Sequence, residues 1–176
     1  MTTVVITNYH RDLECLWKCF KSFHEADEII IISSKFSSLS QKINKGFKMG
    51  GDYVIITNDD VELLSGDIND LCIPNTVTSP LVNGEGQPFW GHIFCVPKTV
   101  YELTGGYDEN YQHAWFDDTD FILTLEKHKI PMQSVPSVNV FHPHNGGTTL
   151  KTIPNFDEAK NHNEEYFNRK WNPSAD

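Results

Sequence analysis

The sequence predicts a single α/β domain with a mostly parallel central sheet flanked by helices. Strand-like and helix-like segments alternate through the first half of the 176 residues, which is the pattern of parallel strands joined by crossover helices. The second strand-like segment carries four consecutive isoleucines, as expected of a parallel strand covered on both faces. An acidic turn follows the third such segment, where open α/β sheets bind their ligands.

The first half of the chain is predicted to form two strand–helix units and a third strand. Leu13, Leu16 and Phe20 recur at the 3.6-residue period of an amphipathic helix, and Gly50 ends the second helix. The expected strands are residues 4–7, 28–33 and 53–57, and the expected helices are residues 12–23 and 39–49.

After Pro80 the alternation becomes irregular, and we expect loops that contain Gly84, Gly86 and Gly91. Pro136 should separate two short strands. No internal repeat or linker is present, so we expect residues 1–176 to form one domain. The expected strands of this half are residues 93–96, 133–135 and 138–141, and the expected helices are residues 98–103, 121–128 and 157–171.

The charge of the chain limits its partners. There are 14 Lys and Arg residues against 24 Asp and Glu residues, and the net charge of -10 argues against a nucleic-acid groove or an anionic membrane surface. A diphosphate ligand would therefore need a cation. The first residues lack the features of a signal peptide, and no apolar run approaches the roughly 20 residues that span a bilayer, so we expect a cytoplasmic protein without direct membrane insertion. The four scattered cysteines are expected to be buried, reduced thiols.

Two segments contain candidate metal ligands. Asn58-Asp59-Asp60 ends a buried strand, and its carboxylates could hold Mg²⁺ or Mn²⁺, although a solvated acidic turn is the simpler alternative. His142 and His144 follow a short strand and could complete such a site with a distant carboxylate, or could be structural. The other histidines of the chain receive no role.

Three carboxylates occur close together at the start of a predicted helix. Asp117, Asp118 and Asp120 follow Trp115 and Phe116. Capping of the helix N-terminus accounts for one of them. Apolar neighbours raise the proton affinity of a carboxylate toward that of a useful general base, which favours a catalytic role. Aromatic rings suit the apolar faces of sugars, so Trp90 with Gly91, Tyr111, Trp115 and Phe116 could line sugar subsites, with core packing as the alternative for each.

Taken in chain order, these segments resemble the GT-A glycosyltransferases of family 2, especially the rhamnosyltransferase-like branch. The matching segments are residues 4–9, residues 44–46 before 51–53, residues 58–61, residues 105–109 and 116–121, His142, and residues 166–171. The resemblance implies a single GT-A (Rossmann-like) domain with a nucleotide-sugar donor half up to about residue 80 and an acceptor and catalytic-base half after it. It implies inverting transfer from a nucleoside-diphosphate sugar to a hydroxyl group of a glycan or glycoconjugate.

The same resemblance implies roles for individual residues. Asp60 and His142 are expected to hold Mn²⁺ or Mg²⁺, Asp118 to be the general base, and Asp117 to position the acceptor or the base. Ser33 stands where the family has an aspartate that contacts the nucleotide base, and Asn58 takes the first position of its DxD site. Residues expected to contact substrate are Thr7, Asn8, Tyr9, Ser33, Asn44, Asn58, Asp59, Trp90, Gly91, Trp115 and Asp120.

Two other functions fit the same residues. A metal-dependent hydrolase could use these acids and histidines to activate water. A non-catalytic nucleotide-sugar-binding module of the same fold is suggested by Ser33, Ser34 and Asn58, which depart from the family pattern.

Overall fold

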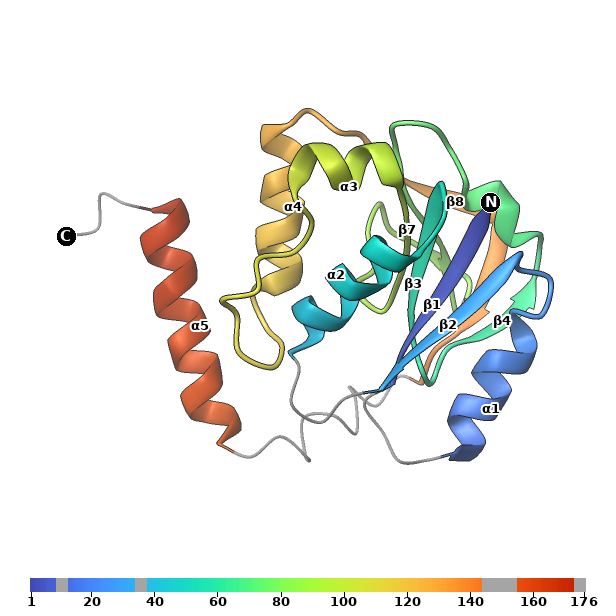
Figure 1. Ribbon diagram of the computed structural model, residues 1–176, viewed down its shortest axis with the longest axis horizontal. Coiled ribbons are helices and arrows are strands. Elements are labelled where there is room, and N and C mark those ends of the chain that lie inside the picture. The colour runs from blue at the N-terminus through green and yellow to red at the C-terminus, as the bar shows by residue number, and fades with distance from the viewer. Residues whose placement is uncertain (9–12, 34–37, 144–154, 173–176) are drawn as a thin grey trace.

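The computed structural model describes residues 1–8, 13–33, 38–143 and 155–172 of the chain (Figure 1). The elements in chain order are β1 (Thr2–Asn8), α1 (Leu13–Ser22), β2 (Glu28–Ser33), α2 (Leu39–Met49), β3 (Tyr53–Asn58), β4 (Glu62–Ser65), the 3₁₀ helix η1 (Ile68–Leu71), β5 (Val77–Val82), β6 (Glu85–Gly86), β7 (Ile93–Pro97), α3 (Lys98–Thr104), α4 (Asp117–Lys127), β8 (Met132–Phe141) and α5 (Phe156–Trp171).

Within these residues the strands form one eight-stranded sheet, in the order β2-β1-β3-β7-β5-β8-β4, with β6 paired to β5. Parallel pairing joins β1 to β2 and β3, and joins β5 to β8. Antiparallel pairing joins β3 to β7, β7 to β5, β8 to β4 and β5 to β6. The α/β fold class is confirmed, and the antiparallel pairing places strands of the second half directly beside β3.

Helices cover both faces of the sheet. On one face, Cys19 and Phe23 at the end of α1 pack into a core that includes Val4 and Ile55. On the other face, α2, α3 and α4 pack into a second core, while α5 lies beyond α4 and the loop before it (Figure 1). The cores hold the sheet between two apolar layers, which leaves its strand ends for polar side chains.

The structure describes the state of the cysteines and the character of the helices, for both of which predictions were made from the sequence. All four cysteines are free, with Cys19 and Cys95 buried and Cys15 and Cys72 partly buried. Among the described residues, no helix has both the length and the apolar character needed to cross a membrane.

The second half contains more strands than expected. Strands β4, β5 and β6 were not predicted from the sequence, and β8 was predicted as two strands separated at Pro136. In the structure β8 is continuous, and its pairing with β5 shifts between the pairs Pro80–Val135 and Leu81–Asn139. Pro136 lies in this irregularity, where its missing N–H interrupts no ladder. Pro80 is tolerated within β5 because the pairing of β5 with β7 is confined to Thr78 and Cys95.

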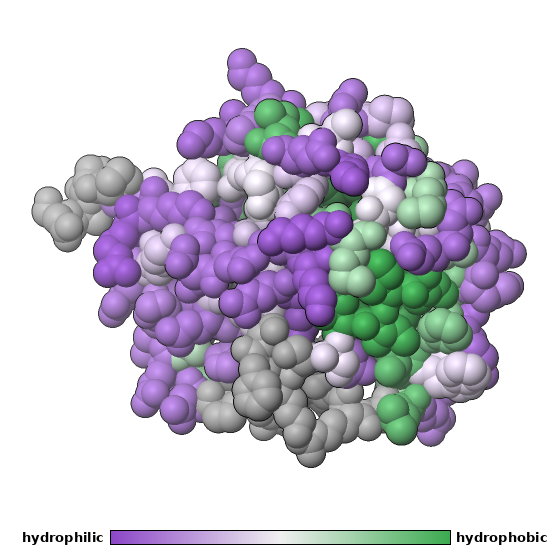
Figure 2. All heavy atoms as spheres, in the orientation of Figure 1, coloured by the Kyte–Doolittle hydropathy of each residue, from purple (hydrophilic) through white to green (hydrophobic). Residues whose placement is uncertain are grey.

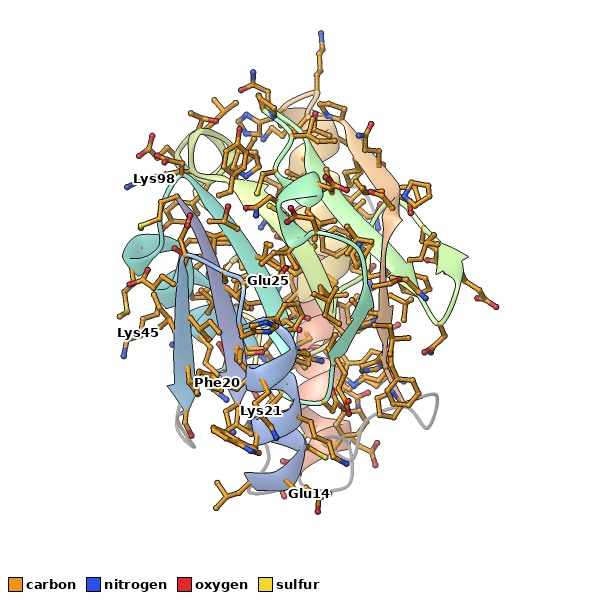
Figure 3. The ribbon with its side chains drawn as sticks, turned by 90° about the vertical axis from the view of Figure 1, so that its right-hand side faces the viewer. Glu14, Phe20, Lys21, Glu25, Lys45 and Lys98 are labelled. Atoms are coloured by element: carbon orange, nitrogen blue, oxygen red, sulfur yellow. The ribbon has the colours of Figure 1, made fainter. Side chains whose placement is uncertain are left out.

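The isoleucine-rich strand β2 has the predicted bounds but not the predicted surroundings. It lies at the edge of the sheet, and Ile31 is 43% exposed. Hydrophobic side chains gather over β2 in Figure 2, and Phe20 projects from α1 toward β2 in Figure 3. A continuous apolar run is therefore also compatible with an edge strand flanked by a helix. An apolar hollow of about 380 Å³ lies here and is lined by Leu13, Leu16, Trp17, Phe20 and Ile31.

Helix α2 is fixed at its start by a capping box and in its middle by close contact with the sheet. Ser38 accepts a hydrogen bond from the Gln41 N–H, and the Gln41 side chain accepts one from the Ser38 N–H. A Cβ atom at Gly46 would lie 2.6 Å from Cγ1 of the buried Val5. The missing side chain of Gly46 therefore sets how closely α2 approaches β1.

We predict that Gly46→Ala destabilises the protein by roughly 1–3 kcal/mol, as overpacking in a core does. Alanine usually stabilises a helix interior relative to glycine by about 1 kcal/mol, so the expected sign is opposite to that of helix propensity. Urea unfolding measures the difference. Lys45→Ala, at the exposed neighbouring position, is the control and should change the free energy of unfolding by less than about 0.5 kcal/mol. A Gly46→Ala variant as stable as the wild type would show that α2 can move away from β1 without cost.

Candidate functional site

The acidic turn lies at the carboxyl end of β3, between β1 and β7. Thr7 of β1 donates hydrogen bonds from its hydroxyl to the carbonyl oxygen of Thr57 at 3.2 Å and to Oδ1 of Asn58 at 3.3 Å. Asp59 is buried in the turn that follows. Thr7, Asn58 and Asp59, which were predicted to contact substrate, therefore form one polar region at the end of the central strands.

The structure brings together the two predicted metal ligands. Nε2 of His142 lies 3.4 Å from Oδ1 of Asp60, and less than a fifth of either side chain is exposed. Asn83 fixes the backbone of His142, because its Oδ1 accepts from the His142 N–H at 3.2 Å and its Nδ2 donates to the His142 carbonyl at 2.8 Å. The described residues contain no cluster of three or more His, Cys, Asp or Glu side chains able to hold a metal. A pair of protein ligands suits an ion that takes its remaining ligands from substrate phosphate and water.

His92 is a site residue that the sequence analysis missed. Its ring stacks on the ring of His142, with centroids 4.0 Å apart and an angle of 12° between the planes, and the Trp90 ring lies 5.3 Å away. Burial and the neighbouring His142 lower the pKa of His92 to about 3, so His92 is neutral at neutral pH. Nε2 of His92 and Nε1 of Trp90 are buried and have no hydrogen-bond partner within the described parts of the chain. The sequence held no signal for His92 beyond its place after Gly91 at the start of a strand.

The predicted base, Asp118, lies at the start of α4 and is held by two contacts. The hydroxyl group of Tyr107 donates to Oδ1 of Asp118 at 2.9 Å. A Cβ atom at Gly91 would collide with the Asp118 carboxylate, so this carboxylate packs directly against the Gly91 backbone. Burial raises the pKa of Asp118, and the Tyr107 hydrogen bond lowers it in part. A raised pKa makes this carboxylate a stronger base than an exposed aspartate.

Asp117 is more deeply buried than its neighbour, with 2% of its surface exposed. Burial and the nearby charge of Asp118 raise the pKa of Asp117, while backbone N–H groups of the turn partly oppose the shift. Oδ2 of Asp117 has no hydrogen-bond partner among the residues that the structure describes. The two acids are coupled, because ionising one makes ionisation of the other less favourable.

Asn44 and Asp120 have partners within the protein. The Asn44 side chain accepts from the Tyr107 N–H at 2.9 Å and donates to the Tyr107 carbonyl at 2.8 Å. Oδ1 of Asp120 accepts from Tyr111 at 3.0 Å and from Nε1 of Trp171 at 2.7 Å, and Lys170 lies 2.8 Å away. Substrate contact by Asn44 and Asp120 stays a prediction, and the observed role of both is to join helices to the loop before α4.

Lys42 is a second site residue that the sequence analysis missed. It is 1% exposed, and its Nζ donates to the carbonyl oxygen of Asn8 at the end of β1, at 3.2 Å. Burial lowers the pKa of Lys42, and the negative charge of Asp59 opposes this shift. Ser33 donates to Oδ1 of Asn8 at 3.5 Å, so three strand ends meet here as predicted. The sequence did contain a signal for Lys42 as a site residue, because this lysine stands next to Ile43 on the apolar face of helix 39–49.

The remaining predicted residues are distributed as follows. Trp115 is 43% exposed and precedes the two acids, with the ring of Phe156 at 6.0 Å. Tyr9 and His144 lie outside the described residues.

The segment from Trp90 to His92 connects the two groups of side chains. Its His92 stacks on His142, the partner of Asp60, and its Gly91 packs against Asp118. A ligand lying over this short segment would contact both the possible metal ligands and the acids at the start of α4.

Solved structures with a similar fold are glycosyltransferases. A Drosophila β-1,4-galactosyltransferase 7 mutant in complex with manganese, UDP-Gal and xylobiose matches with a TM-score of 0.65 and 13% identity, over 91% of this chain and 79% of that chain. The catalytic domain of Drosophila β-1,4-galactosyltransferase 7 in complex with xylobiose matches with a TM-score of 0.66 and 14% identity, over the same shares. GalNAc-T7 with UDP, GalNAc and Mn²⁺ matches with a TM-score of 0.70 and 11% identity, over 99% of this chain and 52% of that chain.

These similarities define the class of the fold. The chain has the GT-A fold, as the resemblance in its sequence predicted. No protein-family model and no curated protein matches the sequence. Membership of family 2 and of its rhamnosyltransferase-like branch stays a prediction, and identities of this size carry the fold but not the activity.

We predict that Asp117→Asn makes the protein more stable and that the gain grows with pH. An unfolded aspartate ionises near pH 4, whereas burial keeps folded Asp117 neutral to higher pH. The stability that the neutral carboxyl contributes is therefore complete below about pH 4 and is lost as the pH rises through the pKa of the folded state. Asparagine does not ionise, so the difference between variant and wild type should reach roughly 1 kcal/mol or more by pH 8.

Thermal unfolding of both proteins between pH 4 and pH 8 measures this difference. The exposed Asp157 on α5 provides a control, because Asp157→Asn makes the same chemical change at a position in contact with solvent. Parallel stability curves for wild type and Asp117→Asn would show that Asp117 is ionised at little cost in the fold.

Proposed function

We propose that this protein is an inverting, metal-dependent glycosyltransferase that moves a sugar from a nucleoside-diphosphate donor to a hydroxyl group of a glycan or glycoconjugate. The observation that carries the proposal is the contact of one segment, Trp90 to His92, with both the Asp60–His142 pair and Asp118. Transfer needs a leaving-group site and a base on opposite sides of the sugar, and this segment lies between such groups. UDP-sugars are the donors to test first, because the similar GT-A structures contain UDP-Gal or UDP.

The residues of the donor side fit a divalent cation. Asp60 and His142 offer one carboxylate oxygen and one imidazole nitrogen that already face each other at 3.4 Å. Both are ligand types that Mn²⁺ accepts, and Mg²⁺ favours the carboxylate. When bound, the ion would offset the negative charge that develops on the leaving diphosphate. In a chain of net charge -10, Lys42 supplies a buried positive charge at the same ends of the strands.

The residues of the acceptor side can activate the acceptor hydroxyl group as the nucleophile. Asp118 takes the proton from the acceptor hydroxyl as that oxygen bonds to the anomeric carbon, and the bond from this carbon to the diphosphate oxygen breaks. Attack from the face opposite the leaving group inverts the anomeric centre. Tyr107 and the Gly91 backbone hold Asp118 in place, so little reorganisation is needed when the proton moves. Trp115, exposed beside the two acids, offers a ring face to an acceptor sugar.

A direct test of the donor side is calorimetric titration of UDP with and without Mn²⁺. We expect binding that requires Mn²⁺, and we expect Asp60→Asn and His142→Ala to weaken it at least about 10-fold, because even groups that only orient metal ligands contribute that much. Glu62→Gln removes a charge two residues from Asp60 and is the control for a general electrostatic effect. Equal UDP affinity in wild type and Asp60→Asn with Mn²⁺ present would remove Asp60 from the donor site.

A test of the acceptor side is the transfer reaction of Asp118→Asn, measured as UDP released from the UDP-sugar in the presence of an accepted glycan. We predict a decrease in kcat of roughly 10² to 10⁴-fold with unchanged UDP affinity, because asparagine keeps the size of the side chain but cannot accept the proton. Asp117→Asn is the matched control and should cost less in kcat and more in acceptor KM.

The outcomes of these measurements also separate the proposal from its alternatives. Near-normal transfer by Asp118→Asn together with loss in Asp117→Asn would move the base by one residue. UDP release that does not depend on any acceptor would indicate a hydrolase. Mn²⁺-dependent binding without turnover would indicate a binding module.

A further inference from the structure

Helix α5 is attached to the rest of the protein through polar side chains and through ring contacts of Phe156, Tyr166 and Phe167 with the loop before α4. Within this helix Ala159 and Asn163 are buried, and the other side chains are partly or fully exposed. At its C-terminal end, Tyr166 donates to Asp108 at 2.8 Å and Lys170 to the same carboxylate at 2.7 Å. Although burial opposes it, hydrogen bonding by Lys170 and its neighbours lowers the pKa of Asp108 to about 2, so this carboxylate is charged. Figure 1 shows α5 alongside the loop that leads into α4.

Asn163 joins α5 to the backbone of that loop. It is 0% exposed, and its Oδ1 accepts from the Gln112 N–H at 2.8 Å. Its Nδ2 lies within hydrogen-bonding distance of three carbonyl oxygens, those of Gln112 at 2.9 Å, Ala114 at 2.9 Å and Trp115 at 3.1 Å. A buried amide with this many backbone contacts fixes the path of the loop and not merely its distance from the helix.

The loop needs such support because its backbone is strained. His113, Trp115 and Phe116 have φ angles of 57°, 82° and 66°, in the left-handed region that side chains other than glycine rarely adopt. Each such residue costs on the order of 1 kcal/mol or more and persists where the surroundings determine it. The consecutive carbonyl groups from 112 to 116 all accept hydrogen bonds, that of His113 from the Leu39 N–H, that of Phe116 from the Asp120 N–H, and the other three from Asn163.

We propose that Asn163 is a positioning residue, which holds the turn at 113–116 so that Asp118 faces the segment from Trp90 to His92. This inference rests on the function proposed above for Asp118. Asn163 touches neither acid, and its effect passes through the backbone that immediately precedes them. The C-terminal helix thus completes the acceptor side of the site, although it contributes no group to the reaction.

The first measurement is hydrogen–deuterium exchange, which needs no substrate. In Asn163→Ala we expect exchange of the amides between 112 and 118 to accelerate at least about 10-fold, with the strands unchanged, because the loop loses its three carbonyl contacts. Asn161→Ala, an exposed residue two positions earlier on the same helix, is the control and should exchange as the wild type does. Faster exchange spread over the whole chain, or no change between 112 and 118, would overturn the proposal.

The second measurement separates positioning from general stability. The donor is whichever of UDP-galactose, UDP-glucose and UDP-GalNAc gives the largest Mn²⁺-dependent thermal shift. With an accepted glycan present, we expect Asn163→Ala to lower kcat for UDP release by roughly 10 to 100-fold, since a displacement of about 1 Å at a reacting group has this effect. Its affinity for UDP with Mn²⁺ should stay within about two-fold of the wild type. A proportional loss of UDP affinity and kcat would overturn the proposal.

Tyr166→Phe is a milder variant for the case in which Asn163→Ala does not fold. It removes one hydroxyl group, and with it the hydrogen bond to Asp108 in the earlier part of the same loop. We expect a smaller change in the same direction, namely faster exchange between 105 and 118 with UDP affinity retained. Unchanged exchange in this segment would count against the role of α5. A wild-type protein that binds none of the three donors in the presence of Mn²⁺ would refute the proposed function, and the exchange measurement would still decide whether Asn163 holds the turn.

Discussion

The hydrogen bond from Tyr107 to Asp118 is the interaction on which the candidate site depends. It requires a phenol ring fixed in the core, and Tyr107 stacks on Phe121 with ring centroids 4.5 Å apart. It requires a fixed backbone, which Asn44 of α2 provides by bonding both the N–H and the carbonyl group of Tyr107. The carboxylate also needs room, which Gly91 leaves by having no side chain. Elements from both halves of the chain therefore meet at one carboxyl group.

Several buried polar groups without hydrogen-bond partners lie near the candidate site. Nε2 of His92, Nε1 of Trp90 and Oδ2 of Asp117 lack hydrogen-bond partners among the described residues. Buried polar groups in proteins usually have partners, and places where this rule fails are often functional. Asn163 and Asn44 are also buried, but their side-chain amides are hydrogen-bonded to the backbone. Buried polar groups with partners therefore support the backbone, whereas those without partners can receive a ligand.

Strand β7 explains how the two halves of the chain come to share a site. It pairs antiparallel to β3, with Thr57 opposite Ile93, so the start of β7 lies beside the end of β3. The segment from Trp90 to His92 immediately precedes this pairing. Asp118 of α4 packs against Gly91 of this segment, and His142 stacks on its His92. Had β7 been parallel to β3, this segment would have lain at the opposite edge of the sheet, because parallel neighbours start at the same edge.

The sequence by itself determined the local structure of the first half. Hydrophobic periodicity placed β2 and α2 at their observed bounds, since apolar spacing reflects the geometry of single elements. The sequence also identified Asp60, His142 and Asp118 as candidates, because residue types that can bind a metal or accept a proton are read directly from the sequence. Periodicity failed for β5 and β8, whose prolines suggest breaks that the observed pairing avoids.

Only the tertiary structure decided which residues meet. The proximity of Asp60 to His142 and the stacking of His92 on His142 depend on sheet order. The attachment of Asp120 to Lys170 depends on where α5 packs. Sequence patterns report on residues a few positions apart, whereas these contacts join elements that are distant along the chain, and side-chain spacing does not encode such pairing. The role of a polar side chain, as a support for the backbone or as a group facing a ligand, therefore became visible only once its partners were known.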